Sequence, residues 1–388
     1  MISDRDRATA HLDPPFAVVD LRAFDANLDD LLRRAGERPI RLATKSVRCR
    51  ALIARALERP GVTGLMCYAL PEALWHVAAG TADDVLVGYP TVDRAALRAL
   101  AADERARRTV TLMVDSVAHL DLVDAVLRPG HPELRVCLEL DAAWRPLPGL
   151  HVGARRSPVH RARTAGALAR AIVDRPGFRL VGVMAYEGQI AGVPDATGAR
   201  IRDGVVRWMQ RRSARELAGR RGAAVAAVRE VAALEFVNGG GSGSVETTRA
   251  DRSVTEIAAG SGLIGSTLFD GYTRMHPRPA VAYALPVVRR PDRRTATLAG
   301  GGWVASGPAA VSRLPSPETG LALTGTEGAG EVQTPVRGRH VPDLGDRVWM
   351  RHAKAGELAE HVTTYHLLDG DRIAASAPTY RGEGKAFG

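Results

Sequence analysis

The sequence predicts an α/β protein in which a TIM-type (β/α)8 barrel is followed by a C-terminal all-β domain. From about residue 39 to 270, short apolar, β-branched runs alternate with longer amphipathic stretches, which indicates a parallel sheet with helical connections. Eight such units in roughly 230 residues match the size and strand count of a barrel. After Tyr272, alternating runs broken by Gly, Pro and Asp turns replace this pattern, which is typical of antiparallel β structure.

The first barrel unit begins near residue 40, and strands and helices then alternate along the chain. The expected barrel strands are Ile40–Ala43, Val62–Met66, Val85–Val87, Val110–Val114, Leu134–Leu140, Leu180–Tyr186, Leu234–Val237 and Val254–Ala258. The expected helices between them include Val47–Leu57, Glu72–Ala79, Arg94–Ala102, Val117–Leu127 and Arg161–Val173. A doubly wound open sheet is the alternative architecture, and the count of eight strands favours the barrel.

The second domain is predicted from its alternating apolar runs. Its expected strands are Ala280–Val288, Thr295–Leu298, Arg347–His352, His361–Leu368 and Arg372–Ala375. Phe16–Asp20, which precedes an expected helix at Phe24–Arg34, is expected to join this domain and tie the two termini together. We therefore expect a barrel domain over residues 21–272 and a β domain over residues 273–388 together with residues 1–20.

The composition is that of an ordinary globular protein. The 388 residues are 45% hydrophobic and 25% charged. No apolar run approaches the ~18 residues that a membrane span needs, and the N-terminus lacks the apolar core of a signal peptide. Cys49, Cys67 and Cys137 lie far apart, which indicates neither a disulfide framework nor a zinc knuckle. We expect a reduced, soluble, cytoplasmic protein that does not bind membranes.

The net charge of +10 comes from arginine, because the chain has fifty arginines and only three lysines. The arginines are scattered among acidic residues, and few aromatic residues are available for base stacking, so we expect no nucleic-acid partner. The scarcity of lysine draws attention to Lys45, Lys354 and Lys385. Where arginine replaces lysine so widely, a remaining lysine is a candidate for chemistry that a guanidinium group cannot perform.

Lys45 directly follows the first expected barrel strand, and barrel active sites lie at the carboxyl ends of the strands. The loops after the seventh and eighth strands are rich in Gly and Ser, in Asn238–Ser244 and Ala259–Gly262. Such loops supply backbone N–H groups and hydroxyls to a phosphate, whereas a flexible linker of similar composition would not lie between two strands of a repeating unit. A lysine beside a phosphate site indicates pyridoxal phosphate, because its amine forms a Schiff base with the aldehyde. The alternative is a solvated surface lysine.

Six segments and the two Gly/Ser loops carry a resemblance to a known family across nearly the whole chain. The segments are Phe16–Asn27 (FAVVDLRAFDAN), Arg41–Arg50 (RLATKSVRCR), Glu139–Ser157 (ELDAAWRPLPGLHVGARRS), Met184–Gly188 (MAYEG), Arg351–Glu357 (RHAKAGE) and Pro378–Gly384 (PTYRGEG). Together they resemble the fold-type III pyridoxal-phosphate enzymes with an alanine-racemase-type barrel, in the D-threonine aldolase / D-serine dehydratase branch. The last two segments are similar to an actinobacterial subgroup labelled amino acid deaminase/aldolase.

The resemblance implies a role for several residues. Lys45 would hold the cofactor aldehyde, and Tyr186 would line the cofactor face. Arg155, or Arg156 if the alignment is displaced by one residue, would hydrogen-bond to the phenolic oxygen of the cofactor. The residues implied at the phosphate are Gly240, Gly241, Ser242, Ser261 and Gly262. The alternatives are a core position for the tyrosine and surface positions for the arginines.

The sequence departs from the family pattern at its metal site. In the branch that uses a divalent ion, a C-terminal histidine is followed two residues later by Cys or Asp, but here the run is His352-Ala353-Lys354. A protonated lysine has no lone pair and cannot replace a thiolate or carboxylate, so we expect no bound metal. Lys354 either places its ammonium where the metal charge would lie or pairs with Glu357. His361, like His366, is expected to be structural.

The resemblance implies a lyase that acts on a β-hydroxy amino acid, expected to be of D configuration, by Cα–Cβ cleavage or by dehydration and deamination. His352 and Lys354 are candidates for its proton transfers. An amino acid racemase with Lys45 as one of two bases is the first alternative, and a noncatalytic cofactor carrier is the second. The β domain disfavours a carrier, because a bare barrel suffices to hold the cofactor. The resemblance also implies a homodimer in which His352 and Lys354 reach the partner subunit's Lys45.

Overall fold

A computed structural model describes residues 3–318 and 320–387. The expected domain ranges also include residues 1, 2, 319 and 388, which lie outside the described residues. The chain divides into two compact units. The barrel unit comprises Leu31–Lys45, Ala54–Gly260 and Phe387–Gly388, and the β unit comprises Met1–Asp30, Ser46–Ile53 and Ser261–Ala386. The units therefore divide after Gly260, which is earlier in the chain than the expected boundary at residue 272.

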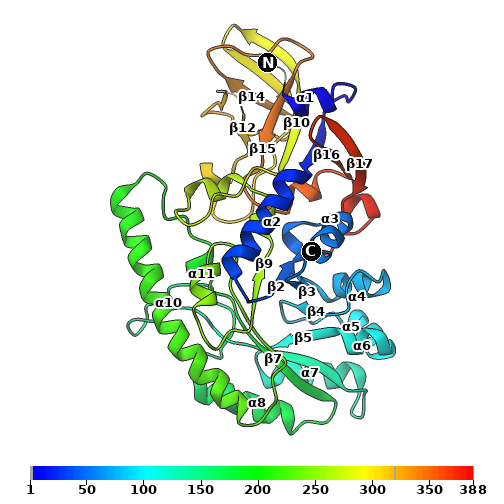
Figure 1. Ribbon diagram of the computed structural model, residues 1–388, viewed down its shortest axis with the longest axis vertical. Helices are drawn as coiled ribbons and strands as arrows, with labels where there is room; N and C mark the ends of the chain where they lie inside the picture. Colours follow the sequence, from blue (N-terminus) through cyan, green and yellow to red (C-terminus); the bar gives the residue numbers. More distant parts are fainter. Residues whose placement is uncertain (1–2, 319, 388) are drawn as a thin grey trace. The chain divides into compact units, whose positions relative to one another are not determined.

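The barrel unit confirms the predicted (β/α)8 fold (Figure 1). Within the described residues, eight strands pair in parallel from β2 to β9, and β2 also pairs with β9, which closes the barrel. The strands are β2 Ile40–Ala43, β3 Val62–Cys67, β4 Val85–Val87, β5 Val110–Val114, β6 Leu134–Glu139, β7 Phe178–Ala185, β8 Phe236–Gly239 and β9 Glu256–Ala259. Their burial on both faces explains the near-continuous apolar runs in the sequence.

Helices connect and cover the strands. They are α2 Leu21–Ala35, α3 Arg50–Leu57, α4 Leu70–Ala78, α5 Arg94–Ala102, α6 Glu104–Thr109, α7 Val117–Leu127, α8 Ala162–Val173, α9 Gly188–Ala191, α10 Arg200–Arg229 and α11 Val245–Arg249. The sequence analysis did not predict the 30-residue helix α10, which packs against α8 (Figure 1). Seven of its residues are buried, and they include the polar or charged Asp203, Ser213 and Arg221 beside the apolar Leu217, Ala224, Val225 and Val228. None of the helices within the described residues is both long and apolar enough to cross a membrane.

The interior of the barrel combines an apolar cluster with a buried ion pair. Phe236 fills space above Gly182, where a Cβ atom would lie 2.3 Å from the Phe236 ring. The guanidinium of Arg41 is 1% exposed and lies between two carboxylates, with its Nε 2.6 Å from Glu256 and its Nη2 2.7 Å from Asp84. Because both partners are acidic, the buried cation is fully compensated.

The β unit holds a nine-stranded sheet, counted over residues 3–318 and 320–387. Its strands are β1 Phe16–Asp20, β10 Val281–Asp292, β11 Thr295–Ala299, β12 Ser316–Pro317, β13 Ala322–Leu323, β14 Gln333–Arg337, β15 Arg347–Arg351, β16 Thr364–Asp369 and β17 Arg372–Pro378. Strand β1 pairs antiparallel with β10 and parallel with β16, which confirms that Phe16–Asp20 joins this sheet. Phe16 and Trp349 pack in its core with ring centroids 5.5 Å apart. A short helix, α1 Asp4–Ala8, precedes β1.

Candidate active site

The carboxyl end of the barrel gathers a lysine and two tyrosines. Lys45 lies in the 3-10 turn Thr44–Ser46, directly after β2, and its Nζ donates a 2.8 Å hydrogen bond to Tyr89 Oη. Tyr89 follows β4, so two barrel strands deliver these groups. Burial opposes ionisation of Tyr89, but the charge and hydrogen bond of Lys45 and the charge of Arg156 lower its pKa. Sequence reasoning missed Tyr89, although its place after a barrel strand was a usable signal.

Arg156 joins the same cluster. Its guanidinium carbon lies 5.3 Å from the centroid of the Tyr89 ring and 5.2 Å from that of Tyr186. The segment is held to β6, because Ser157 Oγ donates a 2.7 Å hydrogen bond to the Glu139 carbonyl. Arg155, the residue that the family alignment named first, and Arg156 are both exposed, and of the two only Arg156 contacts the tyrosine rings. The structure thus brings the adjacent arginine, Arg156, to the two tyrosines.

Tyr186 follows β7 and links this cluster to the glycine loop after β8. A Cβ atom added to Gly188 would lie 2.9 Å from Tyr186 Cε1, and one added to Gly241 would lie 3.4 Å from Tyr186 Cε2. The phenol is buried, which raises its pKa despite the nearby Lys45 and Arg156 cations. The ring therefore lies between two backbone segments that only small residues allow to approach.

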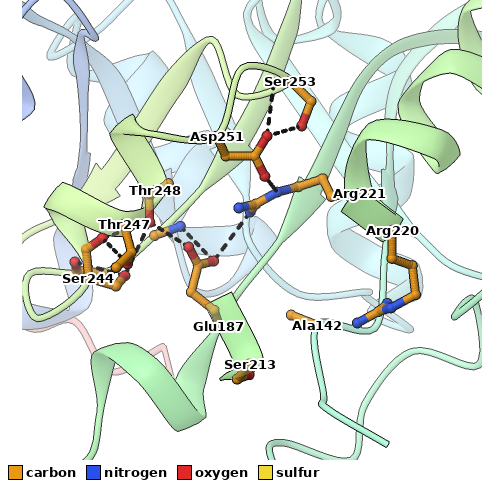
Figure 2. Close-up of polar contacts among 12 residues, drawn as sticks. Ala142, Glu187, Ser213, Arg220, Arg221, Ser244, Thr247, Thr248, Asp251 and Ser253 are labelled. Atoms are coloured by element: carbon orange, nitrogen blue, oxygen red, sulfur yellow. Dashed lines mark hydrogen bonds and ion pairs between the residues drawn. The ribbon is translucent and has the colours of Figure 1, made fainter. Parts of the chain in front are cut away.

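The loop after β8 requires glycine at two positions. Gly240 has φ +97°, and a Cβ atom there would lie 2.9 Å from Ile257 Cγ2. At Gly241 a Cβ atom would lie 2.8 Å from Ala191 Cβ. The Gly240 N–H donates a 2.9 Å hydrogen bond to Glu187 Oε2, so this group shapes the loop (Figure 2). A backbone with no side chains in the way is what a phosphate-binding loop needs.

The other predicted phosphate residues are positioned separately. Ser242 is buried, and its carbonyl accepts a 3.0 Å hydrogen bond from Arg34 Nη2. Ser261 and Gly262 lie in the 3-10 turn Ser261–Leu263, which follows β9 along the chain and is counted with the β unit. The structure thus confirms that both Gly/Ser segments begin where barrel strands end, as the sequence indicated.

Glu139 ends β6 and carries an unusual carboxyl group. It is 3% exposed, and burial raises its pKa from 4.5 to about 7. The neighbouring carboxylates of Asp115 and Asp141 raise this pKa further, while Arg156 opposes them. A carboxyl group that gains or loses a proton near neutral pH is suited to proton transfer.

The two C-terminal candidates lie in the β unit, directly after β15. His352 is buried, and in the described part of the chain neither imidazole nitrogen has a hydrogen-bond partner. Burial, reinforced by the Arg351 cation, lowers the His352 pKa to about 4. Lys354 Nζ donates a 2.6 Å hydrogen bond to Ser306 Oγ and lies 3.8 Å from Glu357 Oε1. The contact with Glu357, one of the two alternatives for Lys354, is therefore present.

An aromatic stack near these residues escaped sequence analysis. The rings of Tyr283 and Trp303 are 4.5 Å apart, and Trp303 stacks on His361 at 5.0 Å with an interplanar angle of 5°. The Tyr283 hydroxyl is buried without a hydrogen-bond partner among the described residues, and burial raises its pKa. His366 Nδ1 lies 2.9 Å from Ser376 Oγ on the next strand. No sequence signal distinguished Tyr283 from an ordinary core tyrosine.

The His352–Lys354 pair does not fit a divalent metal. One neutral imidazole is a suitable ligand, but the ammonium of Lys354 adds a positive charge and no lone pair. A different donor group, Cys67, Glu72 and His76, is buried with ligand atoms within 4.8 Å of one another. Glu72 accepts a 2.7 Å hydrogen bond from the Tyr68 N–H at the start of α4, which is a helix-capping interaction. This group therefore has a structural explanation.

An eight-stranded barrel with a lysine, two tyrosines and a glycine loop at its carboxyl end, in a chain with an antiparallel β unit, defines the fold-type III class of pyridoxal-phosphate proteins. The chain belongs to the family described as "Alanine racemase, N-terminal domain", which matches residues 19–266. This membership confirms the resemblance and the predicted cofactor.

Two curated relatives share moderate sequence identity with the chain. A D-threonine aldolase from Arthrobacter sp. is 29% identical over 275 residues, which cover 68% of this chain and 65% of the relative. A 3-hydroxy-D-aspartate aldolase from Paracoccus denitrificans is 26% identical over 254 residues, which cover 65% of this chain and 60% of the relative. The matched stretch thus spans less than two thirds of each relative.

Solved structures confirm the fold over nearly the whole chain. The D-threonine aldolase from Filomicrobium marinum gives a TM-score of 0.79 at 22% identity and covers 96% of each chain. A D-threo-3-hydroxyaspartate dehydratase from Delftia sp. gives 0.71 at 21% identity and covers 95% of this chain and 97% of the other. The alanine racemase from Bacillus anthracis gives a TM-score of 0.62 at 14% identity, and the match covers 96% of this chain and 99% of the other.

Proposed function

We propose that this protein is a pyridoxal-phosphate-dependent lyase that acts on β-hydroxy D-amino acids by Cα–Cβ cleavage or by dehydration. The observation that carries the proposal is the cluster at the carboxyl end of the barrel, where Lys45 Nζ lies 2.8 Å from Tyr89 Oη. The activities named for the two curated relatives, an aldolase of D-threonine and one of 3-hydroxy-D-aspartate, supply the substrate class.

The residues present fit the cofactor. Lys45 would supply the amine that bonds to the cofactor aldehyde, and Tyr186 would line the cofactor site. Arg156, in place of Arg155, would be the hydrogen-bond donor to the phenolic oxygen, since it is the arginine of the two that lies with Tyr89 and Tyr186. Gly241, Ser242, Ser261 and Gly262 would hold the phosphate, and the positive φ of Gly240 allows the loop conformation.

The proton transfers fall to this chain's own side chains. When bound, the cofactor withdraws electrons from the substrate Cα, so that a bond to Cα can break. Cleavage needs a base at the β-hydroxyl, and the neutral imidazole of His352 provides an unshared lone pair for that proton. Dehydration needs a base at Cα, for which Lys45 Nζ is placed, and an acid at the leaving hydroxyl. Glu139 carries a proton up to about pH 7 and is the barrel's candidate acid.

The assembly that we propose is a homodimer with shared active sites. His352 and Lys354 belong to the β unit, whereas Lys45 belongs to the barrel unit. In the dimer they reach the partner subunit's Lys45, as the family resemblance implies.

Lys354 is proposed to act without a metal. Its ammonium neutralises the substrate carboxylate or the developing charge on the β-oxygen. The contact with Glu357 is long and the lysine side chain is 41% exposed, so the ammonium can exchange Glu357 for substrate while it keeps its 2.6 Å hydrogen bond to Ser306. The buried thiols of Cys49, Cys67 and Cys137 support a reducing, cytoplasmic location.

A substrate panel tests the proposed function. Purified protein with added cofactor is incubated with D-threonine, D-serine and D-3-hydroxyaspartate, and with their L enantiomers, while aldehyde, ammonia and enantiomeric composition are all measured. We expect aldehyde or ammonia from at least one D substrate and from no L enantiomer. Enantiomer formation without either product would establish the racemase instead, and turnover of none of the six by cofactor-loaded protein would favour a carrier.

A further inference from the structure

Glu187 lies directly behind the glycine loop at the carboxyl end of the barrel. It follows Tyr186 in the chain and is 1% exposed. One of its oxygens accepts the 2.9 Å hydrogen bond from the Gly240 N–H, and the other accepts the hydroxyl of Thr248 (Figure 2). These two bonds connect β7, the glycine loop and α11, so the carboxylate fixes the shape of the loop.

A buried arginine lies beside this carboxylate. Arg221, from α10, is 3% exposed, with Nη1 3.4 Å from Glu187 Oε2 and Nε 2.9 Å from Asp251 Oδ2 (Figure 2). Its guanidinium also passes directly beneath the loop, because a Cβ atom at Gly239 would lie 2.5 Å from Arg221 Nη1. Asp251 has further partners of its own, since it accepts the N–H and hydroxyl of Ser253.

This arrangement resolves an electrostatic conflict. A loop that holds phosphate should not be backed by a bare carboxylate, because like charges within about 10 Å in a protein interior weaken binding by roughly tenfold or more. Glu187 cannot be dispensed with either, since the Gly240 N–H would then be buried without an acceptor. Arg221 eases this conflict, because one guanidinium beside the two carboxylates of Glu187 and Asp251 lowers the net charge of the group from −2 to −1 while Glu187 keeps its hydrogen bonds.

We infer that Arg221 is a positioning residue for cofactor phosphate: its cation offsets part of the negative charge of Glu187 and Asp251 behind the glycine loop, so that the loop accepts a dianion. The inference rests on the proposed cofactor site. Arg221 itself is not proposed to contact the phosphate. Removal of the Glu187 charge should therefore compensate for removal of the Arg221 charge.

A binding cycle tests this with two probes, pyridoxal phosphate and pyridoxal, which differ only by the phosphate. Dissociation constants for both are measured by visible absorbance on apoprotein of wild type, Arg221→Met, Glu187→Gln and the double variant. We expect Arg221→Met to raise the dissociation constant of pyridoxal phosphate by about tenfold relative to that of pyridoxal. Glu187→Gln should bind the phosphate at least as tightly as wild type, because the amide oxygen still accepts the Gly240 N–H. In the double variant, pyridoxal phosphate binding should return to about the wild-type value, because the net charge of positions 187, 221 and 251 is then −1, as in wild type.

Two further variants separate charge from folding. Arg221→Lys keeps the cation and should retain the discrimination between the two probes even if the fold is less stable. Arg220→Met makes the same substitution one residue away, where the guanidinium donates to the carbonyls of Asp141 and Ala143, and should leave the ratio of the two constants unchanged.

The outcomes are distinguishable. The inference would be overturned if Arg221→Met weakened the binding of both probes equally, or if the weaker phosphate binding persisted in the double variant. Either result would leave the cofactor site intact. Weaker phosphate binding in Glu187→Gln alone would also overturn the inference, even if Arg221→Met fails to fold. Wild-type protein that binds neither probe would instead overturn the proposed function.

Discussion

The ammonium of Lys45 donates a 2.8 Å hydrogen bond to the phenol of Tyr89, across the carboxyl ends of β2 and β4. Burial raises the pKa of a phenol, yet the pKa of Tyr89 is lowered, because the Lys45 cation, its hydrogen bond and Arg156 favour the phenolate. In the cofactor-free protein, the tyrosine therefore reports on the charge of the lysine.

The Tyr89 phenol should titrate at higher pH when Lys45 loses its charge. In Lys45→Met the pKa of Tyr89 should rise relative to wild type, whereas Lys45→Arg, which keeps a cation, should leave it lowered. The measurement is the ultraviolet absorbance of tyrosinate against pH, with Tyr89→Phe identifying the contribution of this residue. An unchanged titration in Lys45→Met would show that the two groups do not interact.

Neighbouring arginines should differ in their importance for the cofactor. Both arginines are exposed, but of the two only Arg156 lies over the Tyr89 and Tyr186 rings. Arg156→Ala should weaken pyridoxal phosphate binding by about tenfold, and Arg155→Ala should change it little. If Arg155→Ala weakened cofactor binding more than Arg156→Ala did, Arg155 would be the residue at the phenolic oxygen, as the family alignment named it first.

Glu139 should make the cofactor-free protein less stable as pH rises. Its pKa is about 7 in the folded chain and 4.5 in the unfolded one, so between these values the unfolded chain gives up a proton that the folded chain retains. Wild type should lose about 3 kcal/mol across that window relative to Glu139→Gln, which cannot ionise. Urea unfolding at about pH 5 and pH 8 measures this. The exposed Glu58→Gln is the control, and a parallel response of all three proteins would refute the raised pKa.

Chelation of divalent metals should leave the activity unchanged. Lys354 occupies the position where the metal-using branch has Cys or Asp, and its ammonium cannot act as a ligand. The control is Lys354→Cys, which places a thiolate two residues after the His352 imidazole and should raise the zinc content of the purified protein. Activity that falls on chelation and returns with added metal would contradict the assignment.

Strand alternation alone predicted the barrel closely. The sequence placed Ile40–Ala43, Val85–Val87 and Val110–Val114 at their observed bounds, because these strands are largely buried on both faces and are apolar apart from Arg41 and Thr111. It missed α10, since three of the seven buried residues of this helix, Asp203, Ser213 and Arg221, are polar or charged, which weakens the amphipathic pattern. The short strands β12 and β13, with two residues each, carry too few alternating positions to detect.

The site was predictable where chemistry and strand position coincide. Lys45 stood out because lysine is scarce in this chain and because Lys45 directly follows a strand. The glycine loop stood out because a Gly/Ser run between two barrel strands is not explained as a flexible linker. Arg221 and Glu187 could not be found in this way, since one arginine among fifty carries no signal and its partner lies 34 positions earlier. Tyr283 is likewise distinguished only by an unpaired buried hydroxyl within the described residues, which no pattern of residue types reveals.

The central claim, that Lys45 alone bears the cofactor, can be tested by borohydride reduction followed by peptide mass spectrometry. Borohydride fixes the cofactor to whichever amine holds it, and the chain offers only Lys45, Lys354 and Lys385 as lysines. The added mass of the reduced cofactor should appear on the peptide that contains Lys45 and should be absent from Lys45→Arg, which should also be colourless. A yellow Lys45→Arg protein, or a label on either of the other two lysines, would contradict the assignment.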